Sequence, residues 1–321
     1  MSKFIAIDFG GIYTSIYKNG EGLVFKEPSL ISVKKVSDRK FKPVAFGVDC
    51  QKIMPSENLT SFSFVSRGFL SSADYCAEYL DYALNKCARD TKRKGLIAFV
   101  SVPCGTNLLQ ENEYIDACKK AGIGQIEIIR SPICAFMSSG QEIQTALIVD
   151  IGGVKTDVAV VDNNKIIKGA TLGLGGKDIN FAISKFLCEQ LHISANDLEI
   201  EKLKISISSL FNNDGLSYEL NAKDLHDGTN RSFSISAKQL HTVILPYFLE
   251  IIKVIKATLL ELFPQIKEKV IKNPLILCGG VSATTGTSDF FSKELKIKSI
   301  LHPNYENAVV LGLCGNFNKT F

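Results

Sequence analysis

Two short stretches of this sequence combine a carboxylate with paired glycines, a combination that suits phosphate and metal chemistry. In one of them, Asp150 is followed by Ile151-Gly152-Gly153, between apolar segments rich in β-branched residues. Such segments around a glycine-rich break predict two strands joined by a tight turn. We expect the glycines to take positive φ and to bring backbone N–H groups close to an anionic ligand. A carboxylate at the end of the first strand is suited to hold a metal ion or its water ligands.

The same pattern occurs a second time, near the start of the chain. Asp8 is followed by Phe9, Gly10 and Gly11, and both copies read Asp-x-Gly-Gly-x-x-Thr with apolar flanks. A single copy would more often be an ordinary turn between strands. Two copies far apart in the sequence indicate two similar halves. Two such hairpins that face each other would hold one nucleotide between them.

Around the two hairpins, the sequence contains further strand-like and helix-like segments. Three strands are expected between residues 3 and 33, with turns at Gly10-Gly11 and at Asn19-Gly20, because Asn-Gly is a strong hairpin signal. The other expected elements are strands at 96–102 and 275–281, a strand pair at 216–235, and helices at 73–89, 111–121, 177–191, 201–206 and 307–317.

Prolines and glycines mark where several helices begin. Pro132 suits the first turn of a helix that crosses from one half to the other, with Ser131 as its N-cap. A glycine-rich turn at 173–176 precedes the next helix, and helix N-termini bind anions. The stretch 240–263 is an amphipathic helix that should kink or restart at Pro246.

Length and composition set the broad class of protein. The 321 residues, of which 45% are hydrophobic and 22% charged, suit a soluble globular chain of two domains. The net charge of +4 is spread out and does not indicate a nucleic-acid binder. Nine scattered cysteines without a Cys-x-x-Cys motif indicate reduced thiols and a cytoplasmic location. No apolar run reaches the roughly 18 residues of a membrane span.

Several motifs recur in a fixed order along most of the chain. The opening Ile7-Asp8-Phe9-Gly10 is followed at 19–29 by Asn-Gly-Glu-Gly-Leu-Val-Phe-Lys-Glu-Pro-Ser. The later motifs lie at 102–105, 150–160, 174–178, 222–228, 277–280 and 310–312. Together they resemble the MreB family of bacterial actins, within the superfamily of actin, sugar kinases and heat-shock chaperone ATPase domains.

The resemblance implies an α/β chain with the actin-like ATPase fold, in which two pseudo-symmetric halves surround a nucleotide cleft. Domain I would comprise residues 1–145, with a small subdomain at about 34–66. Domain II would comprise residues 146–321, with a small subdomain at about 177–242.

By the same resemblance, the cleft would bind ATP, or ADP or GTP, together with Mg²⁺. Asp8 and Asp150 would hold the metal, and Asp150, Thr156 and the position of Ser131 would serve hydrolysis. Glu201 and Lys204 would face the ribose and adenine, or else form a solvated charged face. The nucleotide-binding residues implied by the resemblance are Asp8, Gly10, Gly11, Ile12, Tyr13, Gly152, Gly153, Val154, Gly175, Gly176, Glu201, Lys204, Gly279 and Gly280.

The sequence departs from the family pattern at three places. The phosphate turns of the family continue with small residues, whereas here they continue with Ile12-Tyr13 and Val154-Lys155. A β-branched residue suits positive φ poorly, so strain is expected at Val154. Lys155 would place a cation near the γ-phosphate or point to solvent. Ser131 stands where MreB proteins have the glutamate that orients the attacking water, and its side chain is two bonds shorter. We therefore expect nucleotide binding with slow or absent hydrolysis.

The resemblance also implies a biological role. MreB-like actins form head-to-tail filaments that control cell shape, and they scaffold cell-wall synthesis at the inner membrane. The expected partners are therefore further copies of the chain, with the membrane surface and cell-wall elongation proteins, and no nucleic acid. A basic run at 92–94 is either a solvated loop or a membrane contact, and it lacks the apolar pair by which MreB proteins often enter the bilayer. The alternatives are a plasmid-segregating or other specialised actin, and a small-molecule kinase of the same fold.

Overall fold

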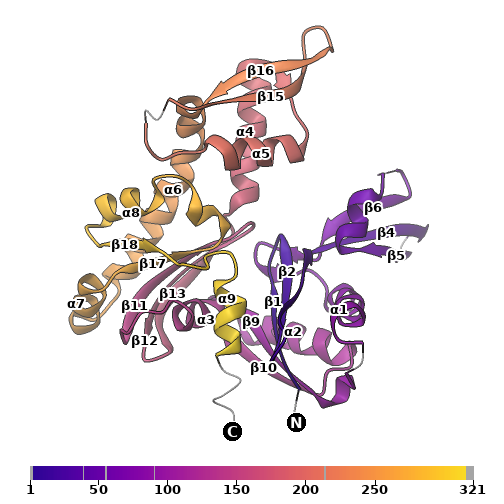
Figure 1. Ribbon diagram of the computed structural model, residues 1–321, viewed down its shortest axis with the longest axis vertical. Coiled ribbons are helices and arrows are strands. Elements are labelled where there is room, and N and C mark those ends of the chain that lie inside the picture. The colour runs from indigo at the N-terminus through magenta and orange to yellow at the C-terminus, as the bar shows by residue number, and fades with distance from the viewer. Residues whose placement is uncertain (1–2, 39, 55, 90, 213–214, 316–321) are drawn as a thin grey trace.

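The structure is a computed structural model that describes residues 3–38, 40–54, 56–89, 91–212 and 215–315. Two five-stranded sheets form the centres of its two halves (Figure 1). The first has the strand order β10-β9-β1-β2-β3, and the second has the order β13-β12-β11-β17-β18. The strands of the first sheet are β1 (Lys3–Phe9), β2 (Tyr13–Lys18), β3 (Gly22–Pro28), β9 (Leu96–Val102) and β10 (Gln125–Arg130). Those of the second are β11 (Thr145–Ile151), β12 (Thr156–Asp162), β13 (Lys165–Leu172), β17 (Leu275–Cys278) and β18 (Ser299–Leu301).

The two sheets have the same topology. In the first, β1 pairs antiparallel with β2 and parallel with β9. In the second, β11 pairs antiparallel with β12 and parallel with β17. Each repeated Asp-x-Gly-Gly motif therefore lies between a central strand and its antiparallel neighbour, and the prediction of two similar halves is confirmed.

The central strands are apolar because they are covered on both faces. Every residue of β11 is buried, and so are all residues of β12 except Asp162. On the outer face of the first sheet lie α1 (Ala73–Cys87) and α2 (Leu108–Lys120), which share a core with β1 through side chains such as Tyr79 and Tyr114. The second sheet is packed in the same way against α6 (Ala237–Leu260), α7 (Pro264–Lys272) and α8 (Thr287–Leu295).

Two short helices, α3 (Ser131–Met137) and α9 (Ala308–Cys314), lie between the two sheets (Figure 1). A third core cluster joins the halves here, because it combines Phe4 of the first sheet with Ile148 of the second. The two helices touch closely: a Cβ placed on Gly312 would lie 1.8 Å from the carbonyl oxygen of Cys134. The junction between the halves is therefore a packed core.

Each half also carries a smaller sheet, and in Figure 1 both smaller sheets lie toward the upper part of the view. The first consists of β4 (Leu30–Ser37), β5 (Lys40–Phe46) and β6 (Leu59–Ser63), with a 3-10 helix, η1 (Gly47–Lys52), beside it. A short hairpin, β7 (Val65–Ser66) and β8 (Phe69–Leu70), connects this smaller sheet to α1. The second consists of β14 (Ile193–Ser194), β15 (Ser217–Asp224) and β16 (Asn230–Ser236), next to α4 (Gly176–Leu191) and α5 (Asp197–Ile207).

Two details of the expected helices are corrected by the structure. Helix α6 runs unbroken through Pro246, which lies on the exposed side of the helix, so the expected restart is wrong and a kink there stays a prediction. Ser131 is not the N-cap of α3, because the cap is Arg130 and the Ser131 hydroxyl donates to the carbonyl oxygen of Val102, 3.0 Å away. The helix expected at 307–317 is described from Ala308 to Cys314, and its last two expected residues lie outside the described part of the chain.

The basic run at 92–94 has partners within the fold. Arg93 and Lys94 belong to a 3-10 turn, η2 (Arg93–Gly95), and the Arg93 guanidinium pairs with Asp81 of α1. It also donates to the carbonyl oxygen of Ala121, 3.0 Å away. Among the described helices, none combines the length and the apolar character that a membrane span requires.

Candidate functional site

The two predicted phosphate hairpins face each other and interlock. A Cβ placed on Gly11 would lie 2.0 Å from Cγ2 of Val154, and a Cβ placed on Gly153 would lie 2.1 Å from Cγ1 of Ile12. Each turn therefore inserts its own branched side chain into the space left by a glycine of the other turn. The structure thus brings the two motifs of the sequence together into one site between the halves.

The glycines of these turns serve a purpose that differs from the expected one. Gly10, Gly11, Gly152 and Gly153 do not have positive φ, so that prediction is wrong for all four. Three of them are required for space instead: Gly11 and Gly153 face side chains of the opposite turn, and a Cβ on Gly10 would lie only 2.5 Å from the carbonyl oxygen of Tyr13, within the same turn. Val154 also has no positive φ, and the strain expected there is absent.

A lysine lies among the carboxylates that were expected to hold a metal ion. Asp8 and Asp150 occupy equivalent positions on β1 and β11, paired in register with Ser15 and Asp157. The Lys155 ammonium lies 3.3 Å from Oδ2 of Asp150 and also forms an ion pair with Asp157. Thus Lys155 points into the cleft and not to solvent.

Asp8 is held by the end of the neighbouring strand β9. Its Oδ1 accepts a hydrogen bond of 2.5 Å from the hydroxyl of Ser101. Burial raises the pKa of the Asp8 carboxyl above its ordinary value, and the hydrogen bond and the Lys155 charge oppose that rise only in part. The ionised form of Asp8 thus depends on a nearby cation or donor.

Asp157 is a cleft residue that the sequence reasoning missed. Its side chain is fully buried, and its Oδ1 accepts from the backbone N–H of Cys104, 3.2 Å away, and from the hydroxyl of Thr171. Strand alternation is the signal that would have found it, because residues two apart project to the same face. Lys155 and Asp157 are two apart at the start of β12.

Thr156, expected to take part in hydrolysis, projects to the opposite face of β12. It is fully buried, and its hydroxyl donates to the carbonyl oxygen of Leu174, 2.8 Å away. The structure does not bring Thr156 to the carboxylates, and the neighbouring Lys155 takes that position.

The start of α4 supports the second hairpin. The backbone N–H of Gly176 donates to the carbonyl oxygen of Gly152, and that of Lys177 donates to Gly153, at 3.0 and 2.8 Å. A Cβ on Gly175 would lie 2.6 Å from the backbone nitrogen of Val154. These N–H groups, expected to bind an anion, hold the turn in place instead.

The side of the cleft expected to hold the adenosine is formed by α4, α5 and a 3-10 helix, η3 (Gly280–Ala283). The Lys204 ammonium bridges from Glu201, 2.7 Å away, to the carbonyl oxygen of Gly176, 3.4 Å away. Gly279 has a φ of +83°, and a Cβ there would lie 2.4 Å from the carbonyl oxygen of Ile151. Gly280 faces open space, because a Cβ placed on it would meet no atom of the described residues within 4 Å. The expected adenosine residues are therefore close together, and a space lies beside Gly280.

Tyr13 does not take part in the contact between the turns. The residue is 47% exposed, and its ring lies beside the Lys26 ammonium, which is 5.7 Å from the ring centre. Lys26 in turn contacts Glu306 and Asn307, ahead of α9.

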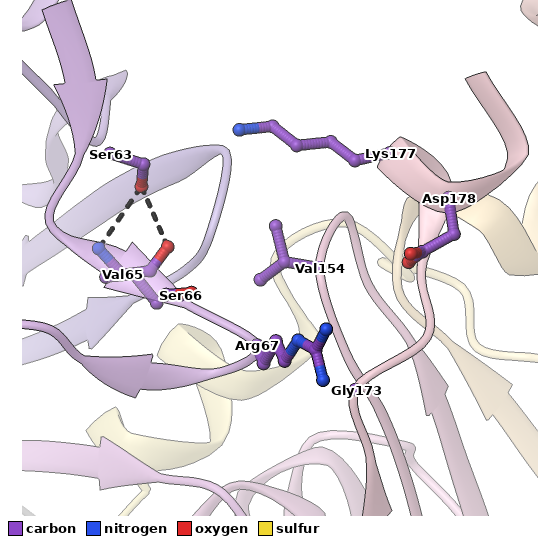
Figure 2. Close-up of a pocket in the computed structure, with 8 residues that line it drawn as sticks. All are labelled: Ser63, Val65, Ser66, Arg67, Val154, Gly173, Lys177 and Asp178. Atoms are coloured by element: carbon purple, nitrogen blue, oxygen red, sulfur yellow. Dashed lines mark hydrogen bonds between the residues drawn. The ribbon is translucent and has the colours of Figure 1, made fainter. Parts of the chain in front are cut away.

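A cavity of about 250 Å³ opens where the two halves meet beside the hairpins (Figure 2). Figure 2 shows Lys177 extending across the opening toward Ser63, with Arg67 beside Gly173 and Val154 between them. Within the described residues, the ion pairs around the cleft use Lys155 and Lys204, and none involves Arg67 or Lys177. The cavity is lined by Ser63, Val65, Ser66, Arg67, Val154, Gly173, Lys177 and Asp178.

These features suit an anionic ligand. Arg67 and Lys177 line the cavity from different halves, so both charges attract an anionic group placed in it. The sequence reasoning did not single out either cation. A metal ion fits less well, because the place between Asp150 and Asp157 is taken by the Lys155 ammonium.

Comparisons with known proteins agree with this architecture. Mbl of Bacillus subtilis (strain 168), a cell shape-determining protein, is 23% identical over 322 residues, which cover 97% of this chain and 94% of Mbl. The cell shape-determining protein MreB of Escherichia coli (strain K12) is 22% identical over 289 residues, which cover 87% of this chain and 83% of that MreB.

Solved structures show the same fold. MreB5 of Spiroplasma citri bound to AMPPNP superimposes with a TM-score of 0.91 at 20% identity, over 99% of this chain and 97% of MreB5. The MamK double helical filament gives a TM-score of 0.81 at 15% identity, over 98% of each chain. The expected actin-like ATPase fold is therefore confirmed.

The family model described as MreB/Mbl protein matches residues 2–321. The chain has two like halves with one Asp-x-Gly-Gly hairpin in each, and the family model matches it along almost its whole length. This chain therefore belongs to the MreB/Mbl family.

Proposed function

We propose that this chain is a nucleotide-binding actin of the MreB type that assembles head to tail into filaments. The observation that carries the proposal is the pair of interlocked hairpins, with a cavity beside them and the cations Arg67 and Lys177 at its wall. The structures of MreB5 bound to AMPPNP and to ADP support an adenine nucleotide as the ligand. ATP, ADP and GTP share the phosphates that this cavity suits. The Mg²⁺ expected with the nucleotide at Asp8 and Asp150 fits this cleft poorly, because the Lys155 ammonium lies 3.3 Å from Oδ2 of Asp150.

The residues of the cleft suggest where each part of the nucleotide would bind. In this proposal the phosphates would lie against the turns at 10–13 and 152–154, and Val154 of the second turn lines the cavity together with Arg67 and Lys177. The adenosine lies beside Glu201, Lys204 and Gly280, where the structure has open space. The halves divide at residues 145 and 146, with small subdomains at about 34–66 and 177–242.

The filament proposal draws on the relatives. MamK forms a double helical filament, and Mbl and MreB are named as cell shape-determining proteins. Control of cell shape from the cytoplasm, by scaffolding cell-wall synthesis at the inner membrane, is the role we propose here. Closure of the halves on a nucleotide would change the surfaces that meet end to end, which couples binding to assembly.

Hydrolysis in this cleft is slow or absent. Phosphoryl transfer to water depends mainly on positioning and electrostatics. Ser131 stands where the family's water-orienting glutamate would be, and its buried hydroxyl already donates to Val102. The nucleotide state of a filament would then change by exchange more than by turnover.

Binding and assembly are tested together on the purified chain. We expect saturable binding of ATP and ADP by calorimetry, and filaments by electron microscopy and pelleting with AMPPNP. The double variant Arg67→Ala with Lys177→Ala should weaken ATP binding by about 10- to 100-fold, because each charge-assisted hydrogen bond to phosphate is lost. Lys272→Ala is the matched control, since Lys272 pairs with Glu268 at the exposed surface of α7.

Two results would overturn the proposal. If neither ATP nor ADP binds, the cleft is not a nucleotide site. If the chain stays monomeric at high concentration with nucleotide, without nucleotide and with lipid vesicles, it is not a filament protein.

A further inference from the structure

The ammonium of Lys155 occupies the centre of the cleft's acidic residues. Its side chain is only 15% exposed, its Nζ lies 3.3 Å from Oδ2 of Asp150, and it forms an ion pair with the fully buried Asp157. Asp8, on the opposite hairpin, is the third carboxylate whose charge it senses. The cation of this site is therefore part of the chain itself.

The lysine is held in place from the other half of the molecule. A Cβ placed on Gly68 would lie 2.5 Å from Cδ of Lys155 and 3.1 Å from its Cβ. Gly68 has a φ of +91° in the turn between β7 and β8, a backbone conformation that favours glycine. The turn of the first half thus packs directly on the lysine stem of the second half. That turn therefore covers one side of the Lys155 side chain.

The charges of the cluster favour a permanent cation. Burial lowers the pKa of the Lys155 ammonium, but attraction by Asp157 and Asp150 outweighs this, and the net pKa stands above its ordinary value. Two ion pairs hold the ammonium beside Asp150 and Asp157. Bound Mg²⁺ typically uses one or two carboxylates together with nucleotide phosphates. At this site the metal would lie in contact with an ammonium of the same sign, and that repulsion is strong away from water.

We propose that Lys155 takes the place of the divalent metal in this cleft, so that the chain binds nucleotide triphosphate without Mg²⁺. This inference rests on the proposed nucleotide-binding function. The ammonium would offset one of the two carboxylate charges of Asp150 and Asp157. It would also present its remaining N–H to a phosphate oxygen, a contact for which a metal ion is otherwise needed.

The wild-type chain provides the first test, and it requires no substitution. ATP and AMPPNP are titrated by isothermal calorimetry, once in EDTA and once in excess Mg²⁺. We expect the dissociation constants in EDTA and in Mg²⁺ to agree within about threefold, which is less than the tenfold change that we would count as a real loss of affinity. Binding that appears only with Mg²⁺ would overturn this inference and leave the nucleotide function standing. Absence of binding in both buffers would instead overturn the proposed function.

A pair of variants tests the lysine itself. Lys155→Met combined with Asp157→Asn removes one cation and one buried anion, and it leaves Asp8 and Asp150 for a metal. We expect this variant to bind ATP about 10- to 100-fold more tightly with Mg²⁺ than in EDTA, because the charge-assisted contact now needs the metal. Lys155→Thr, which keeps Asp157, is the second variant and should show the same change. A variant that folds, by circular dichroism, and still binds ATP equally in both buffers would contradict the assignment.

Lys120→Met is the matched control. Lys120 also bridges two carboxylates, Asp74 and Asp116, at 2.6 and 2.7 Å, but on the exposed surface of the first half. Its loss should leave the ratio of the two dissociation constants as in the wild type. If both cleft variants fail to fold, the wild-type comparison decides the question alone.

Discussion

Ser131 is a buried residue, 3% exposed, at the first position of α3. Its hydroxyl donates to the carbonyl oxygen of Val102, where β9 ends at the cleft. The side chain thereby links α3 to the strand that also carries Ser101, the donor to Asp8. Its contacts are those of a residue that stabilises the edge of the cleft, and its donor is not available to a water molecule.

The first prediction concerns hydrolysis. We expect low ATP turnover in the wild type, since loss of one acid–base or water-positioning group typically costs about 10²- to 10⁴-fold in rate. Ser131→Glu should recover part of this turnover. Ser131→Ala is the control and should leave turnover unchanged, because the hydroxyl does not orient the water. The measurement is steady-state phosphate release at saturating ATP. Wild-type turnover that falls about tenfold in Ser131→Ala would show that the serine itself is catalytic.

At the scale of elements, the hairpins between β1 and β2 and between β11 and β12 form one packed unit. Ile12 fills the space above Gly153, and Val154 fills the space above Gly11. Helix α4 also holds the second turn through two backbone hydrogen bonds, so that turn is supported both by the opposite hairpin and by α4. Smaller residues than Ile12 and Val154 would leave more room here for phosphate. The contact between apolar side chains stabilises the approach of the halves before any ligand binds.

The second prediction tests this contact. Gly153→Ala should destabilise the chain by about 1–3 kcal/mol, because its methyl group collides with Ile12 and overpacking has a cost of this order. Adding Ile12→Ala to Gly153→Ala should restore most of the loss by making room. Gly95→Ala is the control, since a Cβ there meets no described atom within 4 Å. Thermal unfolding is the measurement. Equal melting temperatures for Gly153→Ala and Gly95→Ala would mean that the turns do not interlock in solution.

The third prediction concerns α6, which runs from Ala237 to Leu260 with Pro246 inside it. A proline in a helix interior lacks one backbone donor and crowds the preceding turn, at a cost of about 3 kcal/mol. Pro246→Ala should therefore stabilise the chain, with the melting temperature raised by a few degrees. Lys238→Ala, at another exposed position of the same helix, should change it little. A lower melting temperature for Pro246→Ala would show that the proline supports packing of the helix.

At the scale of the whole molecule, the halves are joined by a chain of hydrogen bonds around His302. The backbone N–H of Asn304 donates to Nδ1 of His302, 2.9 Å away, so the other ring nitrogen carries the proton and donates to Ser138. The Ser138 hydroxyl in turn donates to the carbonyl oxygen of Ala308, 2.6 Å away. Ser138 ends α3 and Ala308 begins α9, so the chain crosses the junction between the halves. This chain of hydrogen bonds is complete only while the His302 ring is neutral, because a protonated Nδ1 cannot accept from the N–H of Asn304.

The fourth prediction is a dependence of stability on pH. Burial lowers the pKa of His302 below its ordinary value of 6.5, with a weaker opposing effect from Ser138. As the pH falls through about 6.5, the unfolded chain binds a proton that the folded chain resists, so stability is lost toward acid and is fully present above that pH. The melting temperature should therefore fall from about pH 7.5 to about pH 5.5, and it should fall less in His302→Asn, which cannot titrate. Identical pH profiles for the two proteins would remove His302 from this role.

Local pattern was enough to determine much of this protein. The two Asp-x-Gly-Gly motifs, the apolar strands beside them, and most helices could be predicted, because side-chain periodicity and turn residues act over a few neighbours. The repeat itself predicted two like halves, since equal local patterns fold into equal units. The order of the motifs was sufficient to indicate the family and, with it, the cleft.

Tertiary structure decided what the cleft residues do. Lys155 lies beside two carboxylates of its own hairpin, Asp150 and Asp157, and Thr156 turns away, because pairing in the sheet sets which face each side chain takes. The glycines of the turns are needed for side chains of the opposite half, which the sequence places far away. Arg67 and Lys177 meet at one cavity only because the halves close on each other. Such contacts between distant segments depend on the packing of the whole fold, and no local pattern carries them.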